Sequence, residues 1–371
     1  MSQKRKLVFI NARFLTEPLT GVQRYGREML SAWDSMLADG TIDREKYRFI
    51  ALMPSPALEG THFEHIEMRV AGRMRSHLWE QISLPRLAKG GFLINLKNTA
   101  PLRHPNFSMV IHDLQVIGAP ETHSGLFKKY YTWNLPRAVQ RAKAVAAVSQ
   151  ATAAEIEKYF GYPQAMITVT TEGHEHIQKI DAQEDILKRE NLETRGYLLA
   201  VSSLNPNKNF AAILRAMTLA QVKVPLVIAG GTNPRVFEGT ELLDSLPENA
   251  RHVGRVSDGE LRALYEHALG FVFPSFYEGW GLPPGEAMQL GCPVIVSNTT
   301  SLPEVCGDAA LYCDPADDAS IAKQMRRLVE DSALRHELSG MGRARALTFS
   351  WRKAAERLWQ QIAPAVAHVD S

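Results

Sequence analysis

The sequence has few cysteines, little net charge and no long hydrophobic run. Only three of its 371 residues are cysteines, and none of them forms a C-x-x-C pair, which favours reduced thiols over a disulfide framework. No stretch approaches the ~20 apolar residues that a membrane-spanning helix needs, and the N-terminal segment does not resemble a signal peptide. We therefore expect a cytoplasmic protein, with any membrane contact confined to its inner face.

Several nucleotide and metal motifs are also missing. The sequence has no G-x-G-x-x-G after a strand, no G-x-x-x-x-G-K loop and no zinc-ligand spacing. These absences argue against a dinucleotide dehydrogenase and against a P-loop enzyme, and we expect no bound metal and no cofactor. The formal net charge of only +2 gives no reason to expect a nucleic-acid partner.

The near-neutral average hides an uneven distribution of charge. The segment from Arg69 to Lys143 holds twelve basic and three acidic residues, a net of +9, so the remaining chain carries −7. A basic segment suits an anionic acceptor or an anionic membrane surface, where each basic residue contributes ~1 kcal/mol. An arginine-rich, solvated surface with no partner would give the same count.

Short apolar runs recur along the chain, and they do not alternate with polar residues. Such runs are typical of strands buried on both faces of a parallel sheet. They lie at 7–10, 49–52, 92–94, 109–111, 145–148, 167–169, 197–201, 226–229, 271–273 and 294–296.

Helical patterns separate these runs, notably at 22–37, 150–159, 210–220 and 257–269. Strands and helices alternate in both halves, which predicts an α/β fold with two Rossmann-like, doubly wound parallel-sheet domains. We expect one domain at 1–180, a second at 181–350 and a C-terminal helix at 351–371 that packs back on the first. Ligands bind outside the carboxyl ends of such strands, so we expect the site in a cleft between two facing domains.

The segment FVFPSFYEGWGLPPGEAMQLGCP, residues 271–293, carries the strongest signal. A strand leads into a loop with glycines, and Pro283-Pro284 opens a helix that stops at Gly291. The start of this helix is a candidate anion site for a diphosphate. Glu278 and Glu286, eight positions apart, could contact opposite ends of one ligand. Alternatively, Glu286 only complements the helix dipole, which is worth ~0.3–1 kcal/mol, and Glu278 is a solvated loop acid.

The E-x7-E pair in this segment resembles the signature of retaining glycosyltransferases of family 4 (glycosyl transferases group 1), which have the GT-B fold. The resemblance covers nearly the whole chain and is closest to bacterial mannosyltransferase-like enzymes of exopolysaccharide and lipopolysaccharide biosynthesis. Five further stretches match in order: NARFLTEPLTGVQRYGREML, IHDLQVIGAPETHS, AVAAVSQATAAEI, VSSLNPNKNF and HVGRVSDGELRALY.

This resemblance implies a role for residues of the second half. Glu286 would bind the ribose hydroxyls, Glu278 the donor sugar, and Lys208 the phosphates, for which it is a catalytic candidate. Backbone N–H groups near Gly281, Leu282 and Pro283 would hold the diphosphate. The remaining candidates for the donor site are Asn207, Gly230, Arg255, Val256, Gly279 and Trp280.

One position departs from the family pattern. Many relatives carry an arginine beside the phosphates where this chain has Ser203, which we keep as a donor-site candidate. Either Lys208 works with helix dipoles and a second cation such as Arg255 or Arg24, or phosphate binding is weaker.

The same resemblance implies that the domain at 1–180 binds the acceptor and the domain at 181–350 the nucleotide sugar, and the first half carries its own candidates. Gly21 and Val22 match the glycine-rich loop near the phosphates and sugar, and Arg24 is an acceptor candidate. His112 matches the family's active-site histidine, expected to contact the donor sugar as charge develops at the anomeric carbon. Asp113 would orient either that imidazole or the acceptor.

The resemblance implies metal-independent hexose transfer with retention, from a nucleotide sugar such as GDP-mannose to a saccharide or polyprenyl-diphosphate-linked acceptor. Front-face attack is expected, because no carboxylate stands out as a covalent nucleophile. The alternatives are a GT-B epimerase or phosphorylase, or a catalytically inactive nucleotide-sugar-binding protein. The segments 73–75 and 127–131 mix basic and apolar residues as a membrane-contacting surface would.

Overall fold

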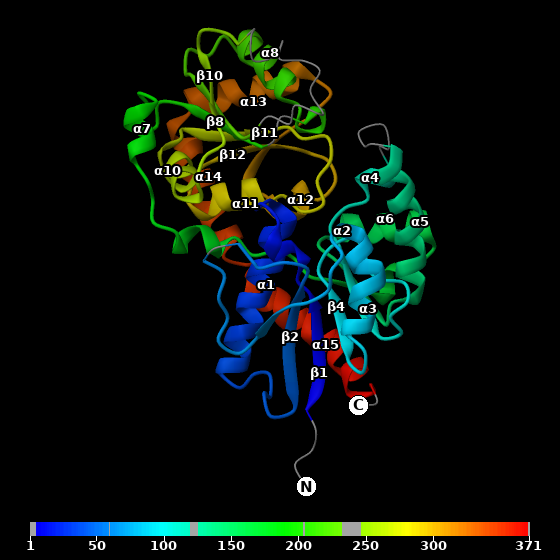
Figure 1. The fold of residues 1–371 in the computed structure, drawn as a ribbon. Coiled ribbons are helices and arrows are strands. Elements are labelled where there is room, and N and C mark those ends of the chain that lie inside the picture. Colours follow the sequence, from blue (N-terminus) through cyan, green and yellow to red (C-terminus); the bar gives the residue numbers. More distant parts are fainter. Residues whose placement is uncertain (1–4, 59, 119–124, 203–204, 232–245, 370–371) are drawn as a thin grey trace. The chain divides into compact units, whose positions relative to one another are not determined.

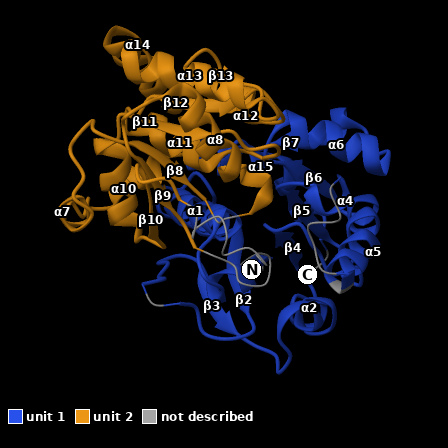
Figure 2. Ribbon diagram, turned by 90° about the horizontal axis from the view of Figure 1, so that it is seen from above, with its two compact units in different colours: residues 1–172, 351–371 blue, residues 173–350 orange. Residues whose placement is uncertain are grey.

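The computed structural model describes residues 5–58, 60–118, 125–202, 205–231 and 246–369 (Figure 1). The chain divides into two compact units, coloured separately in Figure 2. Unit 1 comprises residues 1–172 and 351–371, and unit 2 comprises residues 173–350. The first crossing between the units therefore lies at 172/173 rather than at 180/181.

Unit 1 contains a seven-stranded sheet in the order β3-β2-β1-β4-β5-β6-β7. Every neighbouring pair of strands is parallel. The central strands are apolar and buried on both faces, as their uninterrupted runs predict. The strands are β1 (Lys6–Asn11), β2 (Tyr47–Met53), β3 (Glu67–Val70), β4 (Phe92–Asn95), β5 (Phe107–Ile111), β6 (Ala144–Ala147) and β7 (Ile167–Val169).

Helices and helical turns connect the strands of this sheet. They are η1 (Arg13–Thr16), α1 (Gly21–Ala38), α2 (Ser76–Leu78), the π-helical turn η2 (Trp79–Ser83), α3 (Leu84–Leu87), α4 (Gln115–Gly118), α5 (Gly125–Arg141), α6 (Gln150–Phe160) and η4 (Gln164–Met166). The C-terminal helix α15 (Trp351–Ala367) packs on this unit, where the Trp33 indole donates to the Ala355 carbonyl at 3.1 Å.

Unit 2 contains a six-stranded parallel sheet in the order β10-β9-β8-β11-β12-β13. Its strands are β8 (Leu198–Val201), β9 (Leu226–Ala229), β10 (Ala250–Gly254), β11 (Gly270–Phe273), β12 (Val294–Ser297) and β13 (Ala310–Cys313). Its helical elements are η5 (Glu175–Lys179), α7 (Asp185–Arg189), η6 (Pro206–Lys208), α8 (Phe210–Ala220), α10 (Asp258–His267), α11 (Leu282–Gln289), α12 (Leu302–Cys306), α13 (Asp318–Glu330) and α14 (Ser332–Ala346).

Local sequence signals explain where several helices begin and end. The α10 helix starts with a capping box, because the Ser257 hydroxyl accepts from the Glu260 amide while the Glu260 carboxylate accepts from the Ser257 amide. The α6 helix starts with the Ser149 hydroxyl as its cap and ends at Gly161, whose φ of +64° suits glycine. Within the described ranges, no helix is long and apolar enough to cross a membrane.

Each sheet has one point where the strand order reverses. In unit 1 this topological switch point lies between β1 and β4, and in unit 2 it lies between β8 and β11. Segments that leave these neighbouring strands diverge to opposite faces of the sheet and leave a crevice, which is where open α/β sheets bind ligands. The residues that follow these four strands are therefore the first to inspect.

Candidate functional site

An ion pair marks the switch point of unit 2. Lys208 follows β8, Glu278 follows β11, and Lys208 Nζ lies 2.5 Å from Glu278 Oε1. Both side chains are partly exposed, at 21% and 12%. A cation and a carboxylate therefore stand together at the carboxyl ends of the two strands, where both remain accessible to a ligand.

The loops that carry this pair are braced by asparagines. The Asn207 side-chain amide donates to the Tyr277 carbonyl at 2.8 Å, and its backbone carbonyl accepts from the Phe276 amide at 2.9 Å. Asn209, in the left-handed conformation at φ +61°, donates to the Pro274 and Pro315 carbonyls. These bonds fix Lys208 against the loop after β11. Ser203, the other candidate of this segment, lies outside the described residues.

The loop before α11 is fixed from its other side. The Glu278 amide donates to the Thr300 hydroxyl at 3.1 Å, and the Ser301 hydroxyl donates to the carbonyls of Glu278 and Trp280. Gly281 has a φ of +121°, and a β-carbon there would lie 2.8 Å from Leu302 Cδ2. This position therefore requires glycine on two counts.

The N-terminus of α11 has fewer amide donors than an ordinary helix. Pro283 and Pro284 carry no amide hydrogen, and the Gly285 amide already donates to the Gly281 carbonyl at 3.3 Å. Leu282 is therefore the amide donor that the first turn of α11 can offer to an anion. The helix dipole adds partial positive charge at the same end.

The Glu286 carboxylate, on the second turn of α11, is held by two buried side chains. His176 Nε2 lies 2.9 Å from Oε1, and the Tyr265 hydroxyl lies 3.4 Å from Oε2. A carboxylate accepts, so His176 carries its proton on Nε2. Burial, with the nearby Glu286 carboxylate adding to it, raises the pKa of Tyr265 well above its ordinary value, so the phenol stays protonated and donates. Glu286 is only 8% exposed, so its orientation is set before any ligand arrives.

A second buried histidine supports the same helix. His174 stacks parallel to Trp280 and accepts from the Trp280 indole at Nε2, at 3.2 Å. Burial, helped by the neighbouring His176, lowers the pKa of His174 to about 3, so the ring is neutral with its proton on Nδ1. The His174 ring also fills the space in which a β-carbon of residue 285 would stand, which makes Gly285 a close-packing position.

Three softer candidates lie at the ends of neighbouring strands of unit 2. Gly230 follows β9 and donates to the Gly254 carbonyl at 2.8 Å, while its own carbonyl meets His252 Nε2 at 2.9 Å. Arg255 and Val256 occupy the turn between β10 and α10, where Arg255 is exposed. These residues flank the switch point along the same sheet edge.

Unit 1 places its glycine and arginine candidates at the start of α1. Gly21 and Val22 are the first two residues of this helix rather than loop residues before it. Arg24 pairs with Glu28 at 3.9 Å along the same helix. In the chain, α1 comes after β1, which is one of the two strands at the switch point of unit 1.

His112 follows β5 and is only 5% exposed. Its Nε2 lies 2.9 Å from the Leu96 carbonyl, which fixes the proton on Nε2, and its Nδ1 lies 3.6 Å from the Glu172 carboxylate. Tyr25 contacts the ring edge-to-face at 4.7 Å. The carboxylate facing the imidazole is thus Glu172, whereas Asp113 accepts from the Gln115 amide.

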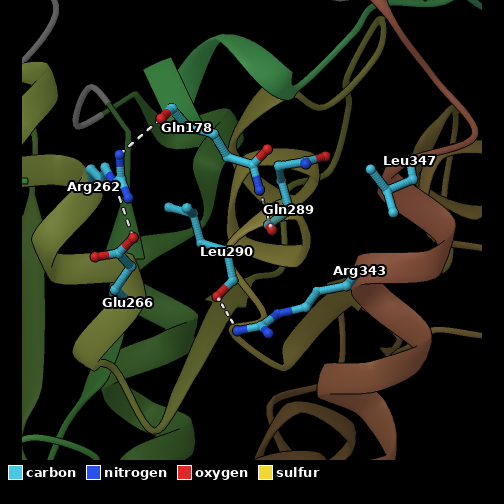
Figure 3. Close-up of a pocket in the computed structure, with 7 residues that line it drawn as sticks. All are labelled: Gln178, Arg262, Glu266, Gln289, Leu290, Arg343 and Leu347. Carbon is cyan, nitrogen blue, oxygen red and sulfur yellow. Dashed lines mark hydrogen bonds and ion pairs between the residues drawn. The ribbon is translucent and has the colours of Figure 1, made fainter. Parts of the chain in front are cut away.

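A pocket of about 370 Å³ lies at the opposite, C-terminal end of α11 (Figure 3). Its arginines are already committed, since Arg343 donates to the Leu290 carbonyl and Arg262 pairs with Glu266 and donates to the Gln178 carbonyl. The pocket is lined by Gln178, Arg262, Glu266, Gln289, Leu290, Arg343 and Leu347. These contacts brace the end of the helix and include none of the candidate donor residues.

Four residues that contact the candidate site residues do not belong to any sequence motif that would have pointed to them. His174 and His176 precede the second-half pattern, Tyr265 lies in an ordinary amphipathic helix, and Glu172 lies shortly after β7. Their partners are 21 to 110 positions away in the sequence, so only the folded chain brings them together.

Solved structures with the same architecture cover both units. Sucrose-phosphate synthase from Thermosynechococcus elongatus matches with a TM-score of 0.74 at 18% identity, over 98% of this chain and 100% of that one. The Anabaena protein HepE, solved with UDP and glucose, matches with a TM-score of 0.73 at 16% identity, over 97% and 100%. The protein thus has the two-sheet α/β fold of GT-B glycosyltransferases.

Sequence comparisons refine this class. Residues 182–345 match the family model of glycosyl transferases group 1. The chain is 35% identical to O-antigen chain mannosyltransferase B of Escherichia coli over 256 residues, which are 65% of each chain. It is 31% identical to the E. coli serotype-specific mannosyltransferase WbdA over 260 residues, 66% of this chain and 32% of that protein. The matches thus span less than two thirds of either relative.

Proposed function

We propose that the protein is a retaining hexosyltransferase of surface polysaccharide biosynthesis. It would transfer mannose from GDP-mannose to a saccharide or a polyprenyl-diphosphate-linked saccharide. The observation that carries the proposal is the Lys208–Glu278 pair at the switch point of unit 2, beside the N-terminus of α11. The mannosyl donor is favoured because both curated relatives described above are named mannosyltransferases.

In this reaction the bond between the anomeric carbon and the phosphate oxygen breaks, and a bond to the acceptor oxygen forms. The acceptor proton passes to the leaving phosphate. Lys208, the Leu282 amide and the dipole of α11 would stabilise the negative charge that develops on the diphosphate. Because these groups already supply positive charge, we propose that no metal is required, and chelation by EDTA should leave the rate unchanged.

The two glutamates would bind the donor at different points. Glu278 would accept hydroxyl protons of the sugar, and Glu286 would accept those of the ribose. The bonds from His176 and Tyr265 would hold the Glu286 carboxylate in one orientation for this contact. We propose that His112 serves the donor sugar, with its ring held by the Leu96 carbonyl.

The donor can be identified without knowing the acceptor. We would measure thermal unfolding with GDP-mannose, UDP-glucose, UDP-N-acetylglucosamine and dTDP-rhamnose, because a ligand that binds the folded state stabilises it by RT ln(1 + [L]/Kd). GDP-mannose should raise the melting temperature of the native protein and of Asp318→Asn, a control that removes a surface carboxylate paired with Arg215. Glu286→Gln should lose the shift. A native protein that responds to none of these donors would refute the proposal.

Retention is tested on the product. Proton NMR of the product, recorded early in the reaction, should show that the new glycosidic bond has the same α configuration as the donor. A β-linked product would refute front-face attack and the retaining assignment together.

Peripheral contact with an anionic membrane is part of the same proposal. On α5, Phe127 and Trp133 are 37% and 45% exposed, and the Arg137 guanidinium lies over the Trp133 ring. Leu78 of α2 is 65% exposed. Aromatic and aliphatic groups among basic residues suit the interface of anionic lipids. Co-sedimentation with phosphatidylglycerol vesicles should fall for Trp133→Ser, and equal binding to neutral vesicles would contradict the charge argument.

A further inference from the structure

The switch point of unit 1 holds a buried polar cluster that none of the proposed roles uses. The strands on its two sides, β1 and β4, end at Asn11 and Asn95, which are direct partners in the sheet. The Asn11 amide donates to Asn95 Oδ1 and to Glu80 Oε2, each at 3.2 Å. By the rule that locates the Lys208–Glu278 pair in unit 2, this is the ligand crevice of unit 1.

Four charged side chains gather above these two asparagines. Lys97 Nζ lies 2.5 Å from Glu17 Oε2, and Arg13 lies 3.5 Å from Glu17 and 3.8 Å from Glu80. Glu80 is fully buried and belongs to the π-helical turn η2, a form that often occurs at functional sites. Arg13 is 7% exposed at its side chain, while Lys97 and Glu17 reach solvent at 15% and 29%. The cluster therefore has a buried base and an accessible rim.

The base of the cluster has unused hydrogen-bonding capacity. Among the described residues, Asn11 Oδ1 has no hydrogen-bond partner although Asn11 is only 3% exposed, and Arg13 Nε makes no hydrogen bond, its contact being the ion pair with Glu17 Oε1 at 3.5 Å. Burying an unpartnered polar atom costs ~1–3 kcal/mol, so such atoms call for a role beyond stability.

The charges of the cluster balance. Two cations, Arg13 and Lys97, face two carboxylates, Glu17 and Glu80, so the crevice has no net charge to attract a phosphate. Burial alone would raise the pKa of Glu17, but Lys97, Arg13 and Gln23 outweigh this and lower it, so Glu17 stays ionised. At the accessible rim, Glu17 can accept hydrogen bonds and Lys97 can donate them. Neighbouring hydroxyls of a neutral sugar, which both donate and accept, would suit this pair.

The cluster adjoins the strand end that carries His112. Asn98, directly after Lys97, accepts from the His112 amide at 2.7 Å and donates to the Asp113 carbonyl at 3.2 Å. A sugar bound at Lys97 would therefore lie beside the His112 segment of the same sheet edge.

We propose that Glu17 and Lys97 bind hydroxyls of a neutral saccharide, which is the accepting end of the acceptor, and that Arg13 and Glu80 position them. This inference rests on the proposed transferase function and names the chemistry of its acceptor. It also excludes the crevice as the site of a lipid-linked diphosphate, which would need excess positive charge.

The test measures saccharide binding without a donor. The probes are α-linked mannobiose and, as the anionic comparison, mannose 6-phosphate, each followed by saturation-transfer NMR and isothermal titration. The variants are Glu17→Gln and Lys97→Met, and the control is Glu67→Gln, which removes a surface carboxylate paired with Arg48 and Arg69 in the same unit. Melting temperatures establish that each variant is folded.

Mannobiose should bind the native protein and the control equally, and each rim variant should weaken it about tenfold or more. The GDP-mannose melting shift should stay unchanged in all of them, because none of the substituted side chains is assigned a contact with the donor. If the native protein fails to bind mannobiose, if the rim variants bind it normally, or if mannose 6-phosphate binds more tightly, the inference is overturned. A missing donor shift in the native protein would instead count against the proposed function.

Discussion

The hydrogen bond from His176 to Glu286 should contribute strongly to the affinity for GDP. His176→Ala removes a hydrogen bond of 2.9 Å to a carboxylate that is 8% exposed, and buried hydrogen bonds to charged groups contribute ~1.5–3 kcal/mol. If Glu286 must be oriented to accept from ribose hydroxyls, affinity for GDP should fall roughly 10- to 100-fold. Tyr265→Phe removes a contact of 3.4 Å, beyond the usual range for such bonds, and should cost much less.

Thermal unfolding with GDP measures this loss directly. At a hundredfold excess over Kd the native protein gains about 2.7 kcal/mol, which a 10- to 100-fold loss of affinity reduces to roughly 1.4–0.4 kcal/mol. His176→Gln, which can still donate from its side-chain amide, should recover part of the shift. His267→Ala serves as control, because His267 pairs with Glu184 at 3.4 Å in the same unit. If His176→Ala binds GDP as tightly as the native protein, or more tightly, the histidine competes with the ligand and the reasoning is wrong.

Three further predictions concern the same unit. Glu278→Gln leaves Lys208 without its carboxylate, so affinity for free GDP should rise in titration calorimetry while the transfer rate falls; a loss of GDP affinity would contradict the pairing argument. Because burial lowers the pKa of His174 from 6.5 to about 3, the unfolded chain takes up a proton in this window and the folded chain does not. The free energy of unfolding should therefore fall by about 1.4 kcal/mol per pH unit as the pH drops from 6.5 toward 3, and urea titrations of His174→Asn should lack this increment. Gly285→Ala forces a methyl group against the His174 ring and should destabilise by ~1–3 kcal/mol, whereas Gly340→Ala, whose added methyl group would meet no atom within 4 Å, should melt at or above the native temperature.

The sequence predicts the interior of both sheets but misses three edge strands. Every apolar run expected to form a strand does so, from β1 to β12. The missed strands are β3, β10 and β13, each at a sheet edge. The β3 sequence Glu-Met-Arg-Val and the β10 sequence beginning Ala-Arg-His alternate or expose polar residues, because an edge strand is not buried on all sides. The uninterrupted apolar pattern that identifies central strands is therefore absent from β3 and β10, whereas β13, Ala-Leu-Tyr-Cys, has that pattern and was missed all the same.

The candidate site also has a part that one sequence segment predicts and a part that depends on residues distant in the sequence. The loop and helix around Glu278 and Glu286 form one continuous segment, so glycine, proline and glutamate at fixed spacing already indicate the elements that the structure contains. The neighbours of these groups come from elsewhere in the chain, as His176 does for Glu286 and Glu172 for His112. No spacing rule links positions 60 or 110 apart, and the β1/β4 crevice could not be predicted because its residues lie on three separate segments.

The ion pair at the unit 2 switch point indicates how the chain could manage without the arginine that many relatives carry at position 203. Lys208 and Glu278 neutralise each other at 2.5 Å in the free protein, so neither charge is left uncompensated near the half-buried loop. In the proposed reaction, a sugar hydroxyl would take over Glu278 as the diphosphate takes over Lys208. A ligand that supplies only the phosphate would have to separate Lys208 from Glu278 and would leave Glu278 without a new partner. The pair would then favour the complete donor over the spent nucleotide, and a single lysine would serve both binding and product release.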